Sequence, residues 1–285
     1  MALRVNYNYS SEFTLINLNQ TEAQQNKSLE RLSSGFRINR AADDAAGYFI
    51  ADQLKQYAAS LEQGTRNAND GISIAQIAQG ALSNVYNILV DIKKKVVQAS
   101  NTSDPTSRGQ IQQDINKLAD AIAKIFQNTE FNGLNLFASN TTTTFTIHYG
   151  GRTDQELVMT TATVAVSAGA TAGASSLVTI GTTGYAIDVT TQTAANASVS
   201  TVDALINAVD DMAANFGSYQ IELEKVISNN ETARVNTSEA ESRIRNVDMA
   251  NEMANFTRLQ ILMQAGTAML AQANAKNQLV LQLLR

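Results

Sequence analysis

The sequence predicts a mainly α-helical protein with a small β-rich region. Apolar residues recur at alternating three- and four-residue spacing near both ends of the chain, which is typical of helices that pack as coiled coils. Two longer helical patterns lie inside these ends, and residues 139–200 between them are dominated by Thr, Ala, Gly and Val. We therefore expect a long coiled-coil-like helical rod from paired N- and C-terminal segments. The middle of the chain should add a β-hairpin and a small β-rich outer domain.

The two ends of the chain contain apolar stripes that need a partner, although chain ends are usually polar and disordered. Periodicity alone leaves open an ordinary intramolecular bundle, whereas the small Gly266 near the second stripe favours a tight assembly. The stripes comprise Leu15, Leu18, Glu22, Gln25, Leu29 and Leu32 at the start, and Leu259, Leu262, Gly266, Met269, Ala273, Lys276, Val280 and Leu283 at the finish. We predict an assembly interface formed by Leu15, Leu18, Leu29, Leu32, Leu259, Leu262, Met269, Val280, Leu283 and Leu284.

Two long helical patterns and one short one lie between the two ends. The first begins after Asp43 and Asp44 and continues to about residue 100. Asp104 and the single proline, Pro105, are typical of an N-cap and the first position of a second helix, which ends near Asn128. The third pattern starts at Val202 and its stripe resumes one residue out of phase at Leu259, so we place a joint between two helices near there or slightly before, around residues 246–255.

The middle of the chain contains an alternating pattern that is typical of strands. Phe145, Ile147 and Tyr149 alternate before a pair of glycines, and Leu157 and Met159 alternate after it, so we expect a β-hairpin. The remainder of residues 139–200 should form short strands and turns. These patterns divide the chain into segments 1–42, 43–138, 139–200, 201–246 and 247–285.

Composition and charge argue against several classes of protein. The net charge of -5 supplies no basic surplus for binding nucleic acid. The absence of cysteine excludes disulfides, thiolate zinc sites and cysteine nucleophiles. No stretch reaches the roughly 18 apolar residues of a membrane-spanning helix, so we expect no membrane insertion. The first residues lack the pattern of a cleaved secretory signal, and we expect any export to use a route without one.

The sequence predicts no catalytic, cofactor-binding or metal-binding residues, and therefore no enzyme. His148 is the single histidine and has no second histidine or cysteine with which to hold a metal. Asp43 and Asp44 are adjacent, so their side chains diverge at a helix start, where negative charge complements the helix dipole.

Several motifs resemble those of bacterial flagellin. They are ERLSSGFRIN at residues 30–39, DDAAG at 43–47, RNANDGISIAQ at 66–76, FNG at 131–133, QIL with QAG at 260–266, and the closing LLR at 283–285. They occur at both ends of the chain in the family's order. The resemblance covers roughly residues 1–160 and 200–285, and it leaves the middle of the chain unmatched.

This resemblance implies a structural subunit that is exported by the flagellar type III apparatus and polymerises into the helical filament for motility. The terminal helices of the family form an inner tube, which would correspond to segments 1–42 and 247–285 here, with a rod domain formed by 43–138 and 201–246. The partners would be identical flagellin subunits, an export chaperone, the filament cap and hook-junction proteins. The location would be the extracellular bacterial flagellum.

Glycines interrupt the first long helical pattern at Gly64, Gly71 and Gly80. Each costs about 1 kcal/mol relative to alanine in a helix, so packing must compensate. In a filament, such positions would permit close contact between neighbouring subunits.

One segment of the chain departs from the family's pattern. The resemblance implies an Arg and, four residues later, a Leu in the rod-helix segment bound by the vertebrate flagellin receptor, where this chain has Asp91 and Lys95. A nearby acidic position is kept as Asp114. A reversed charge and the loss of a buried leucine at a hot spot predict weak receptor recognition.

Two other functions fit the same patterns. A hook-filament junction protein would share similar ends but occur in few copies. A secreted adhesin would use the middle block for binding and its helices as a stalk.

Overall fold

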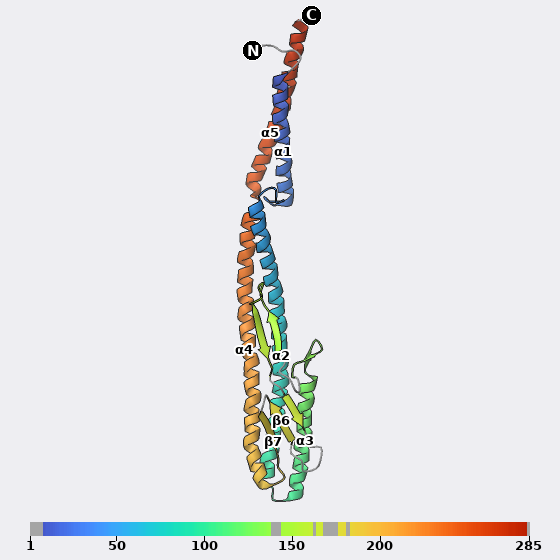
Figure 1. Ribbon diagram of the computed structural model, residues 1–285, viewed down its shortest axis with the longest axis vertical. Coiled ribbons are helices and arrows are strands. Elements are labelled where there is room, and N and C mark those ends of the chain that lie inside the picture. Colours follow the sequence, from blue (N-terminus) through green and yellow to red (C-terminus); the bar gives the residue numbers. More distant parts are fainter. Residues whose placement is uncertain (1–7, 138–143, 162–163, 168–175, 181–182, 284–285) are drawn as a thin grey trace. The chain divides into compact units, whose positions relative to one another are not determined.

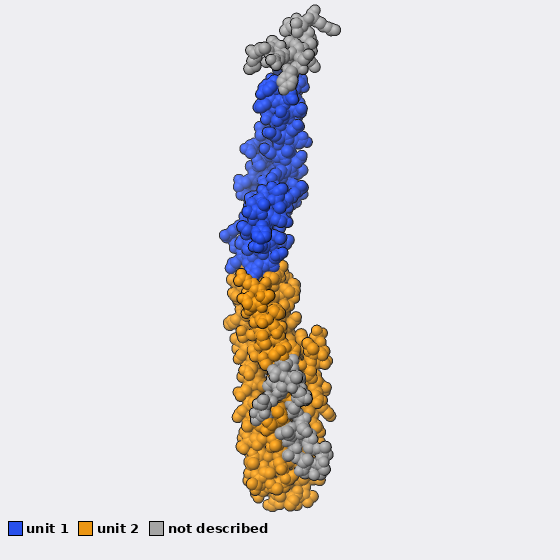
Figure 2. Space-filling model, in the orientation of Figure 1, with its two compact units in different colours: residues 1–58, 235–285 blue, residues 59–234 orange. Residues whose placement is uncertain are grey.

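The computed structural model describes residues 8–137, 144–161, 164–167, 176–180 and 183–283, and the side chains of residues 165–167, 176–177, 183 and 276–283 are not described. The described residues form five helices and three small antiparallel sheets (Figure 1). The mainly α-helical fold with a small β-rich region is thereby confirmed. The chain divides into two compact units, residues 1–58 with 235–285 and residues 59–234 (Figure 2).

The helices follow the predicted patterns closely. They are α1 (Tyr9–Ser34), α2 (Ala45–Asn101), α3 (Pro105–Asn128), α4 (Gln192–Arg245) and α5 (Met249–Leu283). Asp104 caps α3 by accepting hydrogen bonds from the backbone N–H groups of Thr106 and Ser107, as expected from the sequence. The joint predicted between residues 246 and 255 is the short connection between α4 and α5, where Asp248 accepts hydrogen bonds from two N–H groups of the first turn of α5.

The strands pair with their neighbours in sequence. The sheets are β1 (Glu130–Phe131) with β2 (Leu134–Asn135), β3 (Thr144–His148) with β4 (Glu156–Thr160), and β6 (Ser176–Ile180) between β5 (Val164–Ser167) and β7 (Thr183–Ile187). The predicted hairpin is β3–β4, in which Phe145 pairs with Met159 and Ile147 with Leu157. These pairs place the alternating apolar side chains on one face, so the period of two correctly identified the hairpin.

Helix α4 begins earlier than the helical pattern at Val202 indicated. Its first turn is at Gln192, where the Thr191 hydroxyl accepts a hydrogen bond from the Ala194 N–H. The buried Ser198 bonds through its hydroxyl to the backbone of Asp188, which makes a polar side chain acceptable there. The first ten residues of α4 are rich in Ala, Thr and Ser, and this composition hid the helix within the Thr- and Ala-rich block.

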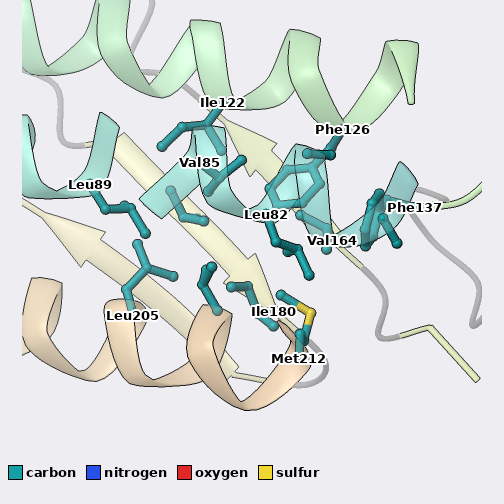
Figure 3. Packing of buried hydrophobic residues seen from close by; sticks show 14 of the residues in the cluster. Leu82, Val85, Leu89, Ile122, Phe126, Phe137, Val164, Ile180, Leu205 and Met212 are labelled. Atoms are coloured by element: carbon teal, nitrogen blue, oxygen red, sulfur yellow. The ribbon is translucent and has the colours of Figure 1, made fainter. Parts of the chain in front are cut away.

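The core of the unit formed by residues 59–234 combines side chains from helices α2, α3 and α4 with side chains from strands β3 to β7. Figure 3 shows Leu82, Val85 and Leu89 of α2 pointing toward Ile122 and Phe126 of α3, toward Leu205 and Met212 of α4, and toward Val164 and Ile180 of the sheet. Phe137 adds an edge-on aromatic contact with Phe126 at a centroid distance of 5.0 Å. The described strands are therefore part of the same core as the helices.

Glycines in α2 allow the β3–β4 hairpin to approach the helix. A Cβ atom at Gly64 would lie 2.1 Å from the Tyr149 carbonyl oxygen. One at Gly71 would lie 3.2 Å from Ile147 Cγ1 of the hairpin and 2.9 Å from Leu223 Cδ1 of α4. The hairpin is held there by Asn67 of α2, which donates to the His148 carbonyl, and by Asn230 of α4, which donates to the Tyr149 carbonyl. We expected these glycines to serve contacts between subunits, but Gly64 and Gly71 serve contacts within one chain.

Replacement of Gly64 by alanine should destabilise this unit. The new methyl group would overlap backbone atoms of the hairpin, and overpacking of this kind costs about 1–3 kcal/mol. The matched control is Gly80→Ala in the same helix, where a Cβ atom meets nothing within 4 Å. The control should raise the unfolding free energy by about 1 kcal/mol, because alanine favours a helix interior. Thermal unfolding followed by circular dichroism measures both effects, and equal stability of the two variants would contradict this account.

Candidate functional site

The candidate site is the pair of terminal helices, α1 and α5, which lie side by side in antiparallel orientation (Figure 1). Near the start of α1, the Asn8 amide donates to the Ala273 carbonyl and the Ser11 hydroxyl donates to the Asn274 side chain. Near its end, the Ser28 hydroxyl donates to Glu252 Oε1 at 2.5 Å. These bonds at both ends of α1 fix the register of the pair.

The seam between the two helices is lined mainly by small or polar side chains on α1. Ser28 is the buried residue of that helix, and Gln25 is half-buried one turn earlier. The full α1 seam, with three- and four-residue spacing, consists of Ser11, Thr14, Leu18, Thr21, Gln25, Ser28 and Leu32. Helix α5 contributes Gly266, where an added Cβ atom would lie 3.0 Å from Leu18 Cδ1. The small residues let the two backbones approach closely but bury little apolar area.

Bulky apolar side chains lie on the other sides of both helices. On α1 the helical repeat places Tyr9, Phe13 and Ile16 away from the seam, and the first two rings stack at a centroid distance of 6.2 Å. The exposed large apolar residues of the pair are Tyr9, Phe13, Leu15, Ile16, Leu29, Met249, Met253, Ile261, Leu262 and Met269. We call these ten residues the outer apolar surface. Monomeric proteins rarely expose so many large apolar groups together, and such patches indicate an interaction site.

The structure divides the predicted interface residues into two groups. Leu18, Leu32 and Leu259 belong to the seam, and Leu259 is only 3% exposed. Leu15, Leu29, Leu262 and Met269 belong to the outer apolar surface. The side chains of Val280 and Leu283, and the whole of Leu284, lie outside the described residues. The heptad stripe of each terminal helix therefore contributes residues to the seam and to the outer apolar surface, because a single neighbouring helix covers only one side of the stripe.

Six of the ten residues of the outer apolar surface were not predicted from the sequence. Tyr9, Phe13 and Ile16 have the i, i+4, i+7 spacing of one helix face, and this spacing could have identified them. On α5, Met249, Met253 and Ile261 fall outside the heptad that passes through Leu259, although Met249 and Met253 have the i, i+4 spacing of one helix face.

A short backbone pairing closes the end of the helix pair. Gly35 ends α1 with φ at +75°, a left-handed conformation that glycine adopts without strain. Its carbonyl accepts a hydrogen bond from the Val247 N–H at 3.0 Å, and Phe36 forms a β-bridge with Asn246. The Arg37 N–H donates to the Arg245 carbonyl at 2.7 Å. The segment after α1 is thus attached to the connection between α4 and α5.

Side chains reinforce this attachment. The Arg245 guanidinium lies 4.6 Å from the centroid of the Phe36 ring, within the range of a cation–π contact. It also lies 3.8 Å from Glu241, one turn earlier on α4. Ile38 is fully buried beside the start of α2, where a Cβ atom on Gly47 would lie 2.9 Å from Ile38 Cδ1.

The two adjacent carboxylates predicted at a helix start have different structural roles. Asp43 accepts a hydrogen bond from Lys27 at 2.7 Å and two more from the backbone N–H groups of Asn39 and Arg40. The bond from Lys27, followed by that from the Arg40 backbone, lowers the pKa of Asp43 from 3.8 to about 2. Asp44 accepts a hydrogen bond from the Gly47 N–H in the first turn of α2. Both carboxylates therefore hold the connection between α1 and α2.

The lysine run on α2 is paired within the chain. Lys93 binds Asp203 of α4, Lys94 binds Asp91, and Lys95 binds Asp114 of α3 at 2.8 Å. The hydrogen bond from Lys95 lowers the pKa of Asp114 below its ordinary value. Asp91, Lys95 and Asp114, which we predicted to form an altered receptor segment, thus take part in two ion pairs, one within α2 and one between α2 and α3.

Within the part of the chain that the structure describes, no group of three or more His, Cys, Asp or Glu side chains could hold a metal ion. His148 lies 3.6 Å from Glu156 across the β3–β4 hairpin. None of the described helices is both long and apolar enough to cross a membrane.

Known proteins match both ends of the chain. Sequence profiles described as the bacterial flagellin N-terminal and C-terminal helical regions match residues 5–142 and 199–284. A flagellin of Halalkalibacterium halodurans is 40% identical over 95% of this chain and 94% of its own length, and a flagellin of Bacillus subtilis is 38% identical over 99% and 100%. The flagellar filament 31.3 kDa core protein of Treponema maltophilum is 35% identical over 99% of both chains. The crystal structure of Bacillus cereus flagellin covers 58% of this chain and 88% of its own, with a TM-score of 0.40 and 20% identity.

Acid should weaken the unit formed by residues 1–58 and 235–285 through Asp43. Because its pKa is near 2 when folded and 3.8 when unfolded, the folded state favours the ionised carboxylate. Its stabilisation is complete above the unfolded pKa and is lost as pH falls toward the folded pKa. Asp43→Asn should lower the unfolding temperature at about pH 5 and show a smaller further loss at about pH 2 than the unaltered chain.

Asp52→Asn is the matched control, since it removes an exposed carboxylate from α2 within the same unit. Thermal unfolding of the three proteins at both pH values checks the expectation. A parallel acid response of the Asp43→Asn protein and the unaltered chain would contradict it.

Proposed function

This chain belongs to the bacterial flagellin family, and we propose that the outer apolar surface of α1 and α5 is its contact with neighbouring subunits. The protein is a structural subunit of the bacterial flagellar filament. A filament subunit needs surfaces that remain exposed in the single chain and become buried on polymerisation. The terminal helices provide surfaces of this kind.

The observation behind the proposal is the distribution of side chains on α1. An ordinary amphipathic helix packs its large apolar residues against its neighbour and exposes its polar residues. Helix α1 instead turns Ser, Thr and Gln toward α5, whereas Phe13, Ile16 and Leu29 are exposed. Packing of identical copies around the pair would bury these groups, at about 25 cal/mol for each Å² of apolar surface removed from water.

Folding of the two ends is then linked to polymerisation. The α1–α5 seam buries few apolar side chains, so the pair gains much of its stability only when neighbours cover the outer apolar surface. Any partner that binds only the ordered form shifts the equilibrium toward it by mass action. We infer that segments 1–42 and 247–285 form the inner tube, and that segments 43–138 and 201–246 form the rod domain.

The remaining partners and the location follow from the family. We propose export through the flagellar type III apparatus, with an export chaperone, the filament cap and hook-junction proteins as transient or terminal partners. The assembled protein would lie outside the cell in the flagellum. Its role would be structural and not enzymatic.

A hook-filament junction protein is the alternative within the same structural class. Such a protein would occur in few copies and would not extend itself into long filaments, so self-polymerisation of the purified chain separates the two. An adhesin would need a binding site in the middle block, and no described contact there favours one over a structural role.

Replacement of Leu29 by asparagine should stop assembly without unfolding the subunit. Leu29 is 53% exposed, so the substitution should change the unfolding free energy by less than about 0.5 kcal/mol. Removal of an apolar side chain from the centre of the interface between subunits should slow elongation of filament seeds at least about tenfold. Light scattering and electron microscopy of seeded samples measure elongation.

The matched control is Asn26→Ala, which alters an exposed polar position on the same helix. Its elongation rate should equal that of the unaltered chain. Normal elongation by the Leu29→Asn protein would show that Leu29 is not part of the assembly contact.

The altered receptor segment should give weak signalling through the vertebrate flagellin receptor. Asp91 places a carboxylate where the family has a guanidinium, and the Lys95 ammonium is bound to Asp114 where the family has a leucine. The double variant Asp91→Arg with Lys95→Leu should raise activation in a cell reporter assay at least about tenfold. Gln98→Leu on the same helix is the control and should leave activation unchanged. Full-strength activation by the unaltered chain would refute this proposal.

A further inference from the structure

Methionines are concentrated on the helix that we assign to assembly. Four of the seven methionines of the chain, Met249, Met253, Met263 and Met269, lie within the first 21 residues of α5. Three of them belong to the outer apolar surface, with exposed fractions of 49% for Met249, 50% for Met253 and 62% for Met269. Met263 is half-buried toward the seam.

The methionines of the other unit are protected. Met159 and Met212 belong to the hydrophobic core, and they are 0% and 8% exposed. Oxidation of methionine depends on access of the oxidant to the sulfur atom. The methionine thioethers on the surface that we propose for assembly are therefore exposed, whereas those in the core of the other unit are buried.

We propose that Met249, Met253 and Met269 are a reversible oxidation site that controls whether a free subunit can join a filament. This inference rests on the assembly role proposed above for the outer apolar surface. Oxidation converts a flexible apolar side chain into a polar sulfoxide, which disrupts methionine-rich interfaces. Incorporated subunits are protected, because their neighbours cover the same side chains.

The oxidant is a peroxide, such as hydrogen peroxide. A lone pair on the thioether sulfur attacks one peroxide oxygen, and the O–O bond breaks. The sulfur loses two electrons and gains one oxygen atom, and the peroxide is reduced to water after proton transfer to the departing oxygen. Methionine sulfoxide reductases reverse the change, with one enzyme for each sulfoxide epimer.

Met269 is the position where the change should matter most. It follows Leu262 by seven residues, so both side chains lie on the same side of α5. A sulfoxide at Met269 would place a polar, strongly hydrated group beside Leu262 in the contact. Covering that group without a hydrogen-bond partner would oppose polymerisation.

The first experiment treats the free full-length chain with hydrogen peroxide and measures the sulfoxide at each methionine by peptide mass spectrometry. Met249, Met253 and Met269 should oxidise at least about tenfold faster than Met159 and Met212. Seeded elongation of the treated chain should fall at least about tenfold, and treatment with both classes of methionine sulfoxide reductase should restore it. Equal oxidation of the buried and exposed methionines would overturn the site assignment.

Substitutions then separate these methionines from other targets of peroxide. The triple variant Met249→Leu, Met253→Leu and Met269→Leu keeps apolar volume, so it should elongate normally and become resistant to peroxide. The control Met263→Leu changes a half-buried methionine of the same helix and should remain sensitive. Met269→Gln imitates the polar sulfoxide and should slow elongation without any oxidant.

The outcomes distinguish this inference from the assembly proposal. Elongation at the normal rate by a chain whose three methionines are fully oxidised would overturn the inference, and so would peroxide sensitivity of the triple leucine variant. Normal assembly by both the Met269→Gln and the Leu29→Asn proteins would instead refute the proposed assembly surface. In that case the oxidation site would have no effect on polymerisation, and the inference would fail with it.

Discussion

The close antiparallel contact between α1 and α5 is the constraint on which the proposed function depends. Small and polar side chains fill this seam, and the Ser28 hydroxyl bonds to Glu252 within it. A seam of this composition brings two helices together but leaves their large apolar residues without cover. The same choice of residues therefore makes a defined helix pair and leaves exposed the surface that we propose is covered by further copies.

The end of that helix pair is fixed by backbone hydrogen bonds as well as by side chains. The glycine conformation at Gly35 turns the chain so that Phe36 can pair with Asn246 and the Gly35 carbonyl can bond to Val247. Asp43 then joins Lys27 to the start of α2. The backbone groups named here are paired locally, although the buried Nε atoms of Arg31 and Arg245 have no hydrogen-bond partner. The helices therefore have defined ends while the outer apolar surface remains available.

The other unit shows the opposite distribution of apolar residues. Leu82, Leu89 and Leu205 are almost completely buried, and the strands supply Val164 and Ile180 to the same cluster. Gly64 lets the hairpin approach α2 closely, and Lys93 and Lys95 of α2 bind acidic side chains of α4 and α3. This unit buries most of its large apolar side chains in that cluster, although Ile77, Tyr86, Val97, Leu134, Val158 and Ile221 remain 39–61% exposed. The contrast explains why we assign assembly to the terminal helices, and why methionines are protected in one unit and exposed in the other.

The sequence by itself determined the helices, the hairpin and the family, because periods of 3.6 and 2 and local motifs such as Asp104 before Pro105 act over short distances. It did not determine the start of α4, because an Ala- and Thr-rich segment lacks an apolar period and forms a helix with support from the buried Ser198. Only the tertiary structure decided which leucines face α5 and which remain exposed. Leu18 and Leu29 occupy the same heptad stripe, but Leu18 is half-buried and Leu29 is exposed. This difference in burial depends on which side of α1 the partner helix covers. That choice is made by contacts between residues more than 200 positions apart, such as Ser28 with Glu252, and no local pattern encodes it.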